Sequence, residues 1–251
     1  FELAVLALCN RCFKALINPK FYLSIEKRYN TQDIVDFFGI SKRMNAGRAW
    51  YKGKRLLEIG CGLGKYSVEA AARGAREVCG IDINEEGIGF ATAKIQQLGL
   101  ANVSFQAMSA CRLQFEDNSF DGAFSHTVLE HLPDVPAALA EVYRVLKPGA
   151  EFIFTFNPFR SRHGAHVNHF IGVPWPCFFF EQETIAIFWT RQRDAFLTSR
   201  SANPEMALLK NSVGIAGLNR LKVSELEATI RNSRFTIAAT AVFNDEAFLL
   251  R

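Results

Sequence analysis

The sequence predicts an α/β fold built on a doubly wound, mostly parallel sheet. Short apolar runs alternate with helical stretches between residues 54 and 156, and the first apolar run ends in a glycine-rich turn. Regular alternation of strands and helices is typical of parallel sheets covered by helices on both faces. We expect strands at 54–59, 77–82, 103–107, 120–125 and 151–156, and helices at 65–73, 85–98 and 135–146.

The glycine-rich turn points to a ligand that approaches the backbone closely. Its glycines are Gly60, Gly62 and Gly64, and glycine permits approaches that a Cβ atom would block. The dinucleotide fingerprint G-x-G-x-x-G would require a glycine where the chain has Lys65 or Ser67. The spacing therefore excludes that fingerprint, and no phosphate-binding P-loop is present.

An acidic residue ends the second expected strand. Asp82 lies eighteen positions after Gly64, and a carboxylate near this distance holds the ribose hydroxyls in nucleotide-binding α/β units. Its alternative role is the N-cap of the helix that follows.

Four stretches of the chain form a recognisable set. They are Leu-Glu-Ile-Gly-Cys-Gly-Leu-Gly, Gly-Ile-Asp-Ile-Asn, Glu-Asp-Asn-Ser-Phe-Asp followed by Leu-Glu-His-Leu, and Arg-Val-Leu-Lys-Pro-Gly. In their order and spacing they resemble the class I S-adenosylmethionine-dependent methyltransferases. The resemblance covers residues 50–157 and, more weakly, 220–251.

The resemblance implies a Rossmann-like methyltransferase fold with seven strands. The last two strands, at 235–243 and 247–251, would follow a helix at 224–233 and form an antiparallel hairpin. We expect N-terminal helices, including one starting at Thr31, and helical structure at 181–199. The expected units are a helical cap at 1–50, a cofactor-binding core at 51–157, an inserted acceptor-site lid at 158–220 after strand five, and the end of the core sheet at 221–251.

The resemblance also assigns cofactor contacts. The three glycines would pass beneath the methionyl and ribose parts of S-adenosylmethionine, and Glu58 would orient their loop or hold the methionyl ammonium. Many relatives carry Asp at the end of strand three to receive the adenine amino group, whereas this chain has Met108 there, so Ser109 or a backbone carbonyl would substitute. The expected cofactor contacts are Glu58, Gly60, Gly62, Gly64, Asp82, Ile83, Met108, Ser109 and His126.

Two residues after strand four, Glu130 and His131, are candidates for catalysis, beside the expected cofactor contact His126. His126, Glu130 and His131 lie on the rim that faces the methyl group. Histidine is the most frequent general base, so we predict His131 as the base, with Glu130 orienting it or the acceptor. In many relatives the same Leu-Glu-His-Leu is structural, and that alternative stays open.

The insertion contains a second histidine cluster, His163, His166 and His169. His166 is the second candidate base. Metal binding, with Cys177 as a further ligand, is an alternative, as is a solvated loop. Because no carboxylate lies within the run, we expect no metal site. The aromatic run at 171–180 is expected to form the core of the insertion or an apolar wall over the acceptor.

Bulk composition limits the classes of partner. The 251 residues are 49% hydrophobic and 22% charged with a net charge of +4, and no Lys/Arg run marks a nucleic-acid surface. Six cysteines without a disulfide pattern indicate a cytoplasmic setting. Residues 1–17 are too short and too interrupted to span a membrane; we expect a helix that packs on the domain, or else one lying on a membrane surface. The first residue is Phe rather than Met, which leaves open whether residues precede it.

These observations predict S-adenosylmethionine-dependent methyl transfer to oxygen or carbon of an apolar or aromatic small molecule. One alternative is a protein or RNA methyltransferase, which predicts an open basic groove. The other is a non-catalytic protein that binds S-adenosylmethionine. The acceptor, the attacked atom and the oligomeric state are not specified by the sequence.

Overall fold

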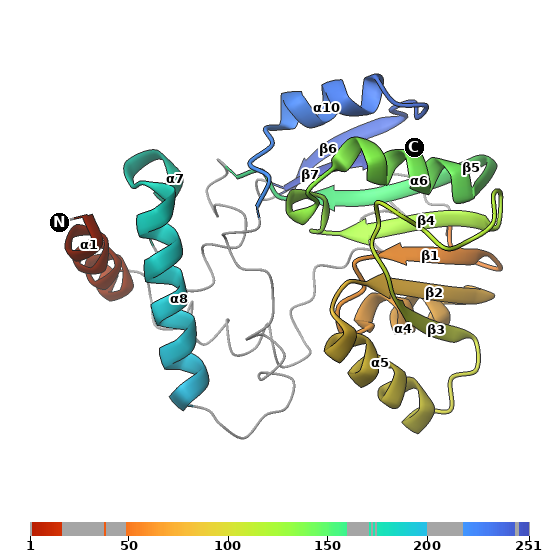
Figure 1. Cartoon of the computed structure of the whole chain (residues 1–251), viewed down its shortest axis with the longest axis horizontal. Helices are drawn as coiled ribbons and strands as arrows, with labels where there is room; N and C mark the ends of the chain where they lie inside the picture. The colour runs from red at the N-terminus through yellow and green to blue at the C-terminus, as the bar shows by residue number, and fades with distance from the viewer. Residues whose placement is uncertain are drawn as a thin grey trace.

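A seven-stranded sheet forms the centre of the molecule. The computed structural model describes residues 2–16, 38, 49–159, 171, 173, 175–199, 218–243 and 246–250. Within them the strand order is β3-β2-β1-β4-β5-β7-β6 (Figure 1). The strands are β1 (Arg55–Ile59), β2 (Glu77–Asp82), β3 (Val103–Ala107), β4 (Phe120–His126), β5 (Leu146–Phe156), β6 (Ala239–Phe243) and β7 (Glu246–Leu250).

The first five strands are parallel and the last two form a hairpin. Strand β1 pairs in parallel with both β2 and β4, β2 with β3, and β4 with β5. Strand β7 is antiparallel to both β5 and β6. The predicted doubly wound, mostly parallel fold is therefore confirmed. The order reverses between β1 and β4, and ligands of open α/β sheets bind beside this reversal, at the carboxyl ends of the strands.

Helices cover both faces of the sheet. They are α4 (Lys65–Ala72), α5 (Glu85–Gln97), α6 (Val135–Val145) and α10 (Val223–Arg231). Adjacent residues of β1 point to opposite faces: Leu57 belongs to the core under α6 and α10, and Leu56 to the core under α4. Burial on both faces explains the consecutive apolar residues of the inner strands β1 and β5, whereas the edge strand β3 is largely exposed.

Two of these helices begin at side-chain caps that the sequence carries locally. The Asn84 side chain accepts a hydrogen bond from the Gly87 N–H at the start of α5, and Asp134 accepts one from the Ala137 N–H at the start of α6. Short polar side chains satisfy the first N–H groups of a helix in this way. Asn84, and not Asp82, is therefore the N-cap of α5.

Strand β5 is longer than expected because it pairs on both sides of a turn. Leu146 is opposite Phe120, and regular pairing resumes with Glu151 opposite Gly122 after a register shift. Gly149, with a φ of +76°, lies in the bulge between them. The Lys-Pro-Gly segment thus follows the end of α6 at Val145, close to the predicted helix end, and forms a bulge within the strand.

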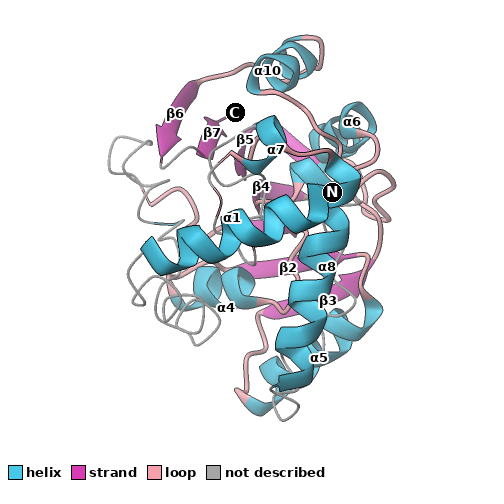
Figure 2. Ribbon diagram, turned by 90° about the vertical axis from the view of Figure 1, so that its left-hand side faces the viewer, coloured by secondary structure: helices cyan, strands magenta, loops and turns pink. Residues whose placement is uncertain are grey.

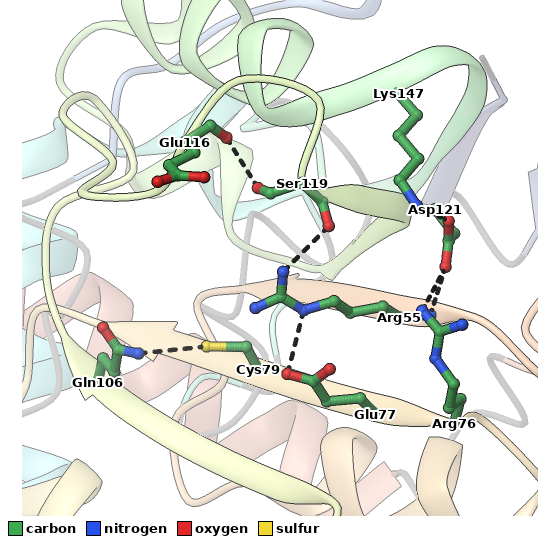
Figure 3. Close-up of polar contacts among 9 residues, drawn as sticks. All are labelled: Arg55, Arg76, Glu77, Cys79, Gln106, Glu116, Ser119, Asp121 and Lys147. Atoms are coloured by element: carbon green, nitrogen blue, oxygen red, sulfur yellow. Dashed lines mark hydrogen bonds and ion pairs between the residues drawn. The ribbon is translucent and has the colours of Figure 1, made fainter.

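Charged residues hold the amino ends of the strands, away from the carboxyl edge (Figure 3). The Arg55 side chain donates to Glu77 Oε1 at 3.0 Å and to the Ser119 carbonyl at 3.1 Å. Asp121 accepts from the Arg55 N–H at 2.9 Å and pairs with Arg76 and Lys147. These ion pairs keep the pKa of Asp121 below its usual value against the opposing effect of burial.

The N-terminal helix and the insertion after β5 pack together as one cap. It consists of α1 (Glu2–Leu16), α7 (Pro176–Phe179) and α8 (Gln182–Ser199). Leu6 of α1 packs with Ile185 and Trp189 of α8, and the Glu2 carboxylate accepts a hydrogen bond from the Thr184 hydroxyl at 2.7 Å. Figures 1 and 2 both place α1 and α8 in front of the carboxyl ends of the parallel strands. Described residues from the two ends of a long sequence separation, in α1 and in the insertion, thus share one hydrophobic cluster.

The aromatic run of the insertion is only partly buried, so it does not form the core of the insertion along its whole length. Ile171 and Val173 are buried in the cap, but Trp175, Phe178 and Phe179 are 46%, 58% and 70% exposed. The four-residue helix α7 explains the difference, because a single turn can place only one side against the cap. The helix expected from Thr31 lies outside the described residues except Phe38, which packs against Trp50 on the α4 face of the sheet.

Candidate functional site

A cavity of about 730 Å³ lies at the carboxyl ends of β1, β2 and β4. Its walls come from the glycine-rich turn, the start of α5, the segment after β3 and the turn after β4. The described lining residues are Ile59, Gly60, Gly62, Leu63, Ile81–Gly87, Met108–Ala110, His126–Val128 and His131–Pro133. Of the predicted cofactor contacts, all except Glu58 and Gly64 line it.

Glycine is favoured at the three positions of the turn for different structural reasons. A Cβ atom at Gly60 would lie 2.4 Å from a methyl group of Val128, and one at Gly64 would lie 2.3 Å from the Phe105 ring. A Cβ atom at Gly62 would meet no atom within 4 Å, although its φ of +51° favours glycine. Gly60 and Gly64 therefore permit close packing inside the protein, whereas Gly62 leaves open space on the cavity wall.

Asp82 is held with its carboxylate at the cavity. Oδ2 accepts the Gly62 N–H at 2.9 Å, and Oδ1 accepts the Asn84 N–H at 2.9 Å. Each carboxylate oxygen has two acceptor sites, so both oxygens keep capacity for a further donor. A pair of vicinal hydroxyls is the donor pair that such a carboxylate suits, as the sequence predicted for ribose.

The neighbouring wall is apolar. Ile83 is 65% exposed directly after Asp82, and an exposed large aliphatic side chain on a cavity wall suits the face of a flat ring. Met108 is buried, and its N–H donates to the Asp82 carbonyl at 3.0 Å. The Ser109 hydroxyl accepts the Cys111 N–H at 3.2 Å, so this hydroxyl stabilises its own turn.

Charge on the cavity wall is negative. Asp82, Glu85 and Glu86 line it, and none of the described lining residues is Lys or Arg. A phosphate-bearing ligand would meet uncompensated repulsion from three carboxylates. The wall is therefore suited to a neutral or cationic ligand.

His126 is fixed at the end of β4. Its Nδ1 lies 2.8 Å from the hydroxyl of the buried Thr155, and its ring meets the Tyr66 ring edge-on with centroids 4.9 Å apart. The same Thr155 hydroxyl accepts the Thr127 N–H at 2.9 Å. The contacts with Thr155 and Tyr66 thus fix the orientation of the His126 imidazole at the cavity wall.

The turn after β4 presents His131 and buries Glu130. We call residues 128–133 the rim turn; it contains the 3-10 helix η1 (Leu129–His131). His131 lines the cavity, whereas Glu130 is 2% exposed and does not. The structure therefore brings His126 and His131 to one wall and places the Glu130 side chain behind it.

Glu58 lies beneath the glycine turn, inside the protein. It is 1% exposed, and the Ser67 hydroxyl of α4 donates to its Oε2. Burial raises the pKa of Glu58 to about 8, against the lowering effect of the Ser67 hydrogen bonds. The contact joins the end of β1 to α4 on either side of the glycine-rich turn.

The insertion histidines lie outside the described residues. His163, His166 and His169 therefore have no observed position, and the roles considered for them, including that of His166 as a base, stay predictions. In the described part of the chain, no three His, Cys, Asp or Glu side chains gather as a metal site. There, too, no helix has the length and apolar character needed to cross a membrane.

Sequence reasoning missed several residues that shape this site. Val128 and Leu132 line the cavity as ordinary apolar residues, without a pattern that marks them. Asn219, at the end of the insertion, donates from Nδ2 to the carbonyls of Leu129 and Leu132 at 2.6 and 3.0 Å. These residues are about ninety positions apart along the chain, and no local motif signals such a contact.

Comparison with known proteins shows which type of α/β domain this fold and cavity resemble. Residues 57–154 match the family described as "Methyltransferase domain". An S-adenosylmethionine-dependent methyltransferase from Aquifex aeolicus shares the fold with a TM-score of 0.55 at 17% identity, covering 91% of this chain and 96% of that one. One from Methanosarcina mazei has a TM-score of 0.52 at 25% identity, covering 79% and 92%. Residues 57–154 thus match a methyltransferase domain, and the described residues have the fold of S-adenosylmethionine-dependent methyltransferases.

Curated relatives match part of this chain. 24-methylenesterol C-methyltransferase 2 of Arabidopsis thaliana is 33% identical over 48% of this chain and 35% of its own length. O-methyltransferase cnsE of Penicillium expansum is 34% identical over 41% and 37%. Phosphoethanolamine N-methyltransferase 2 of Caenorhabditis elegans is 32% identical over 41% and 24%. The chain thus matches about a quarter to a third of these relatives, whose names specify three different attacked atoms.

Proposed function

We propose that this protein binds S-adenosylmethionine in the cavity and transfers its methyl group to an apolar small-molecule acceptor, at oxygen or carbon. The observation that carries the proposal is an oriented Asp82 carboxylate on a cavity wall that is negatively charged. A carboxylate with two oriented oxygens suits ribose, and three lining carboxylates without a lining Lys or Arg suit a cationic sulfonium better than a dinucleotide.

The residues present match the parts of that cofactor. Asp82 would accept the ribose hydroxyls, Ile83 would pack against adenine, and the open space at Gly62 would admit the methionyl chain. Met108 and Ser109 would border the adenine edge. Bound S-adenosylmethionine supplies an electrophilic methyl group on a positively charged sulfur.

The chain's own task is then to align the acceptor, exclude water and take up a proton where one is released. Alignment alone contributes a large share of such a rate enhancement. His131 is the candidate base because it lies on the cavity wall, in the rim turn that follows β4. Buried Glu130 is a positioning candidate, and His126 a cofactor neighbour. His166 is the alternative base.

The position of the cap supports an enclosed acceptor site. Helices α1 and α8 lie in front of the carboxyl edge (Figure 2), which is the side on which an acceptor must meet the methyl group. An enclosed site suits a small molecule better than a folded protein or an RNA duplex. The sterol C-methyltransferase and the O-methyltransferase among the relatives support the same acceptor class. From the cysteines without a disulfide pattern we further propose a cytoplasmic location.

A labelled-methyl assay tests this function. The protein is incubated with S-adenosylmethionine carrying a tritiated methyl group and a cell extract that contains metabolites, protein and RNA. We expect label in the fraction that partitions into organic solvent. Label in precipitated protein or RNA would instead establish the corresponding alternative acceptor. Cofactor binding with no label in any fraction would indicate a non-catalytic binding protein.

A further inference from the structure

Asn219 connects the end of the insertion to the rim turn through three hydrogen bonds and makes a fourth to its own segment. Its Nδ2 donates to the carbonyls of Leu129 and Leu132, and its backbone N–H donates to the Glu130 carbonyl at 2.8 Å. Its Oδ1 accepts the Leu221 N–H at 3.2 Å. Three carbonyls of one short turn are thus bound by a single residue.

The rim turn depends on such an outside partner. Its 3-10 helix has three residues, and its internal hydrogen bonds run from the His131 N–H to Val128 at 2.8 Å and from the Leu132 N–H to Leu129 at 3.3 Å. Short 3-10 segments have poorer hydrogen-bond geometry than α-helices and little stability of their own. Asn219 supplies the donors that hold this backbone in place.

The same turn forms a wall of the cofactor cavity. Val128, His131 and Leu132 line it. Val128 also occupies the space that glycine leaves at position 60, where a Cβ atom would lie 2.4 Å from its methyl carbon. A displacement of the rim turn would therefore change the cavity wall, the packing on the glycine-rich turn and the position of His131 together.

Asn219 lies where the cap ends and the core begins again. Leu218 is 7% exposed and belongs to the hydrophobic cluster of the cap, with Ile185 and Trp189. Leu221 packs instead against the core of the sheet. The residue that binds the rim turn is thus directly bonded to one that is anchored in the cap.

We propose that Asn219 is a positioning residue that fixes the rim turn, and with it His131, against the bound cofactor, and so couples docking of the cap to cofactor affinity. The cofactor part of this inference rests on the proposed function. Coupling between two sites is reciprocal, so cofactor binding should in turn protect the Asn219 amide from exchange with solvent.

The test compares Asn219→Asp with Asn102→Asp in the full chain. Aspartate keeps the size of asparagine and an acceptor for the Leu221 N–H, but it places a carboxylate against two carbonyl oxygens. Asn102 is the matched control, since its Nδ2 also donates to a backbone carbonyl, that of Ala75 at 3.3 Å, away from the cavity.

Three quantities are measured at a temperature where circular dichroism shows both variants folded. They are the affinity for S-adenosylmethionine by calorimetry, hydrogen exchange of peptides covering 128–133, and the titration midpoints of His126 and His131 by NMR. We expect Asn219→Asp to weaken the affinity at least tenfold, to speed rim-turn exchange without ligand, and to shift His131 but not His126. Asn102→Asp should match the wild type.

Wild-type affinity together with unchanged rim-turn exchange in Asn219→Asp would overturn the proposal. If the wild type itself does not bind S-adenosylmethionine, the proposed function is wrong, and rim-turn exchange and the His131 midpoint still decide the positioning claim. If Asn219→Asp does not fold, Asn219→Ser replaces it. Serine has one donor for two carbonyls, so we expect an intermediate loss of affinity; an unchanged affinity there would contradict the proposal.

Discussion

At the scale of single residues, Glu58 shows how the site makes stability depend on pH. Its pKa is about 8 in the fold against 4.5 for the free side chain. Between these values the folded protein holds a proton that the unfolded chain releases, so raising the pH favours unfolding. This carboxyl alone should lower stability by up to about 1.4 kcal/mol per pH unit.

Glu58→Gln should remove that dependence, because an amide stays neutral in both states. Urea unfolding between pH 5 and pH 8 measures it. We expect the wild-type free energy of unfolding to fall more steeply with pH than that of the variant, with the difference confined to this range. Parallel pH profiles would show that Glu58 is ionised in the fold.

His131 is the residue-scale test of the chemistry. If the acceptor releases a proton during transfer, His131→Ala should lower turnover by about 10²-fold or more while leaving S-adenosylmethionine affinity nearly unchanged. Labelled-methyl transfer and calorimetry measure the two effects. If His131→Ala remains active and His166→Ala does not, the base lies in the insertion. Full activity in both variants would mean that alignment is sufficient.

At the scale of elements, the glycine-rich turn separates structural from ligand-binding glycines. Gly64→Ala places a Cβ atom 2.3 Å from the Phe105 ring at a φ of +77°. The clash and the left-handed backbone together should cost about 2–4 kcal/mol of stability. Gly62→Ala meets open space, so only the backbone cost of about 1–2 kcal/mol remains, but its methyl group enters the cavity.

Urea unfolding and calorimetry distinguish the two glycine variants. Gly64→Ala should lose more stability, and Gly62→Ala should lose cofactor affinity while the protein stays folded. Equal stability losses would contradict the packing argument for Gly64. Wild-type affinity in Gly62→Ala would place the methionyl chain elsewhere.

The elements differ in how far the sequence predicts them. Strands β1 to β4 and their helices follow from local signals, namely apolar runs, the glycine turn, and helix caps such as Asn84. The position of Asp82 at the cavity could be predicted because its distance from Gly64 reflects the length of one strand–helix–strand unit. The bulge of β5 and the exposure of Trp175 were not predicted, because both depend on what the segment packs against.

At the scale of the whole molecule, the cap brings together two segments that lie far apart in the sequence. Leu6 and Ile185 are both fully buried in one cluster, although nothing in either segment specifies the other. Asn219 and the rim turn illustrate the same limit within the site. Sequence periodicity indicates that a face is buried, but partners this distant along the chain emerge only from the folded structure.

Two isoleucines of α8 test the cap as a packed unit. Ile185 is fully buried, whereas Ile187 is 37% exposed on the same helix. Ile185→Ala should destabilise the cap by about 2–5 kcal/mol and speed proteolysis within it. Ile187→Ala should change stability by less than about 0.5 kcal/mol. Limited proteolysis with mass spectrometry measures the rate of cleavage within the cap in both variants. Equal cleavage rates would show that α8 does not depend on this cluster.

The central claim is that the cavity at the carboxyl ends of β1, β2 and β4 binds S-adenosylmethionine through Asp82. Calorimetry with the wild type, Asp82→Asn and Asp121→Asn tests it most directly. Asp121 is the control, because it is an aspartate of the same sheet that lies at the amino ends of the strands, away from the cavity (Figure 3). Loss of a charge-assisted hydrogen bond costs about 1.5–3 kcal/mol, so Asp82→Asn should bind roughly 10- to 150-fold more weakly. Asp121→Asn should bind like the wild type. Unchanged affinity in Asp82→Asn, or an equal loss in both variants, would contradict the account.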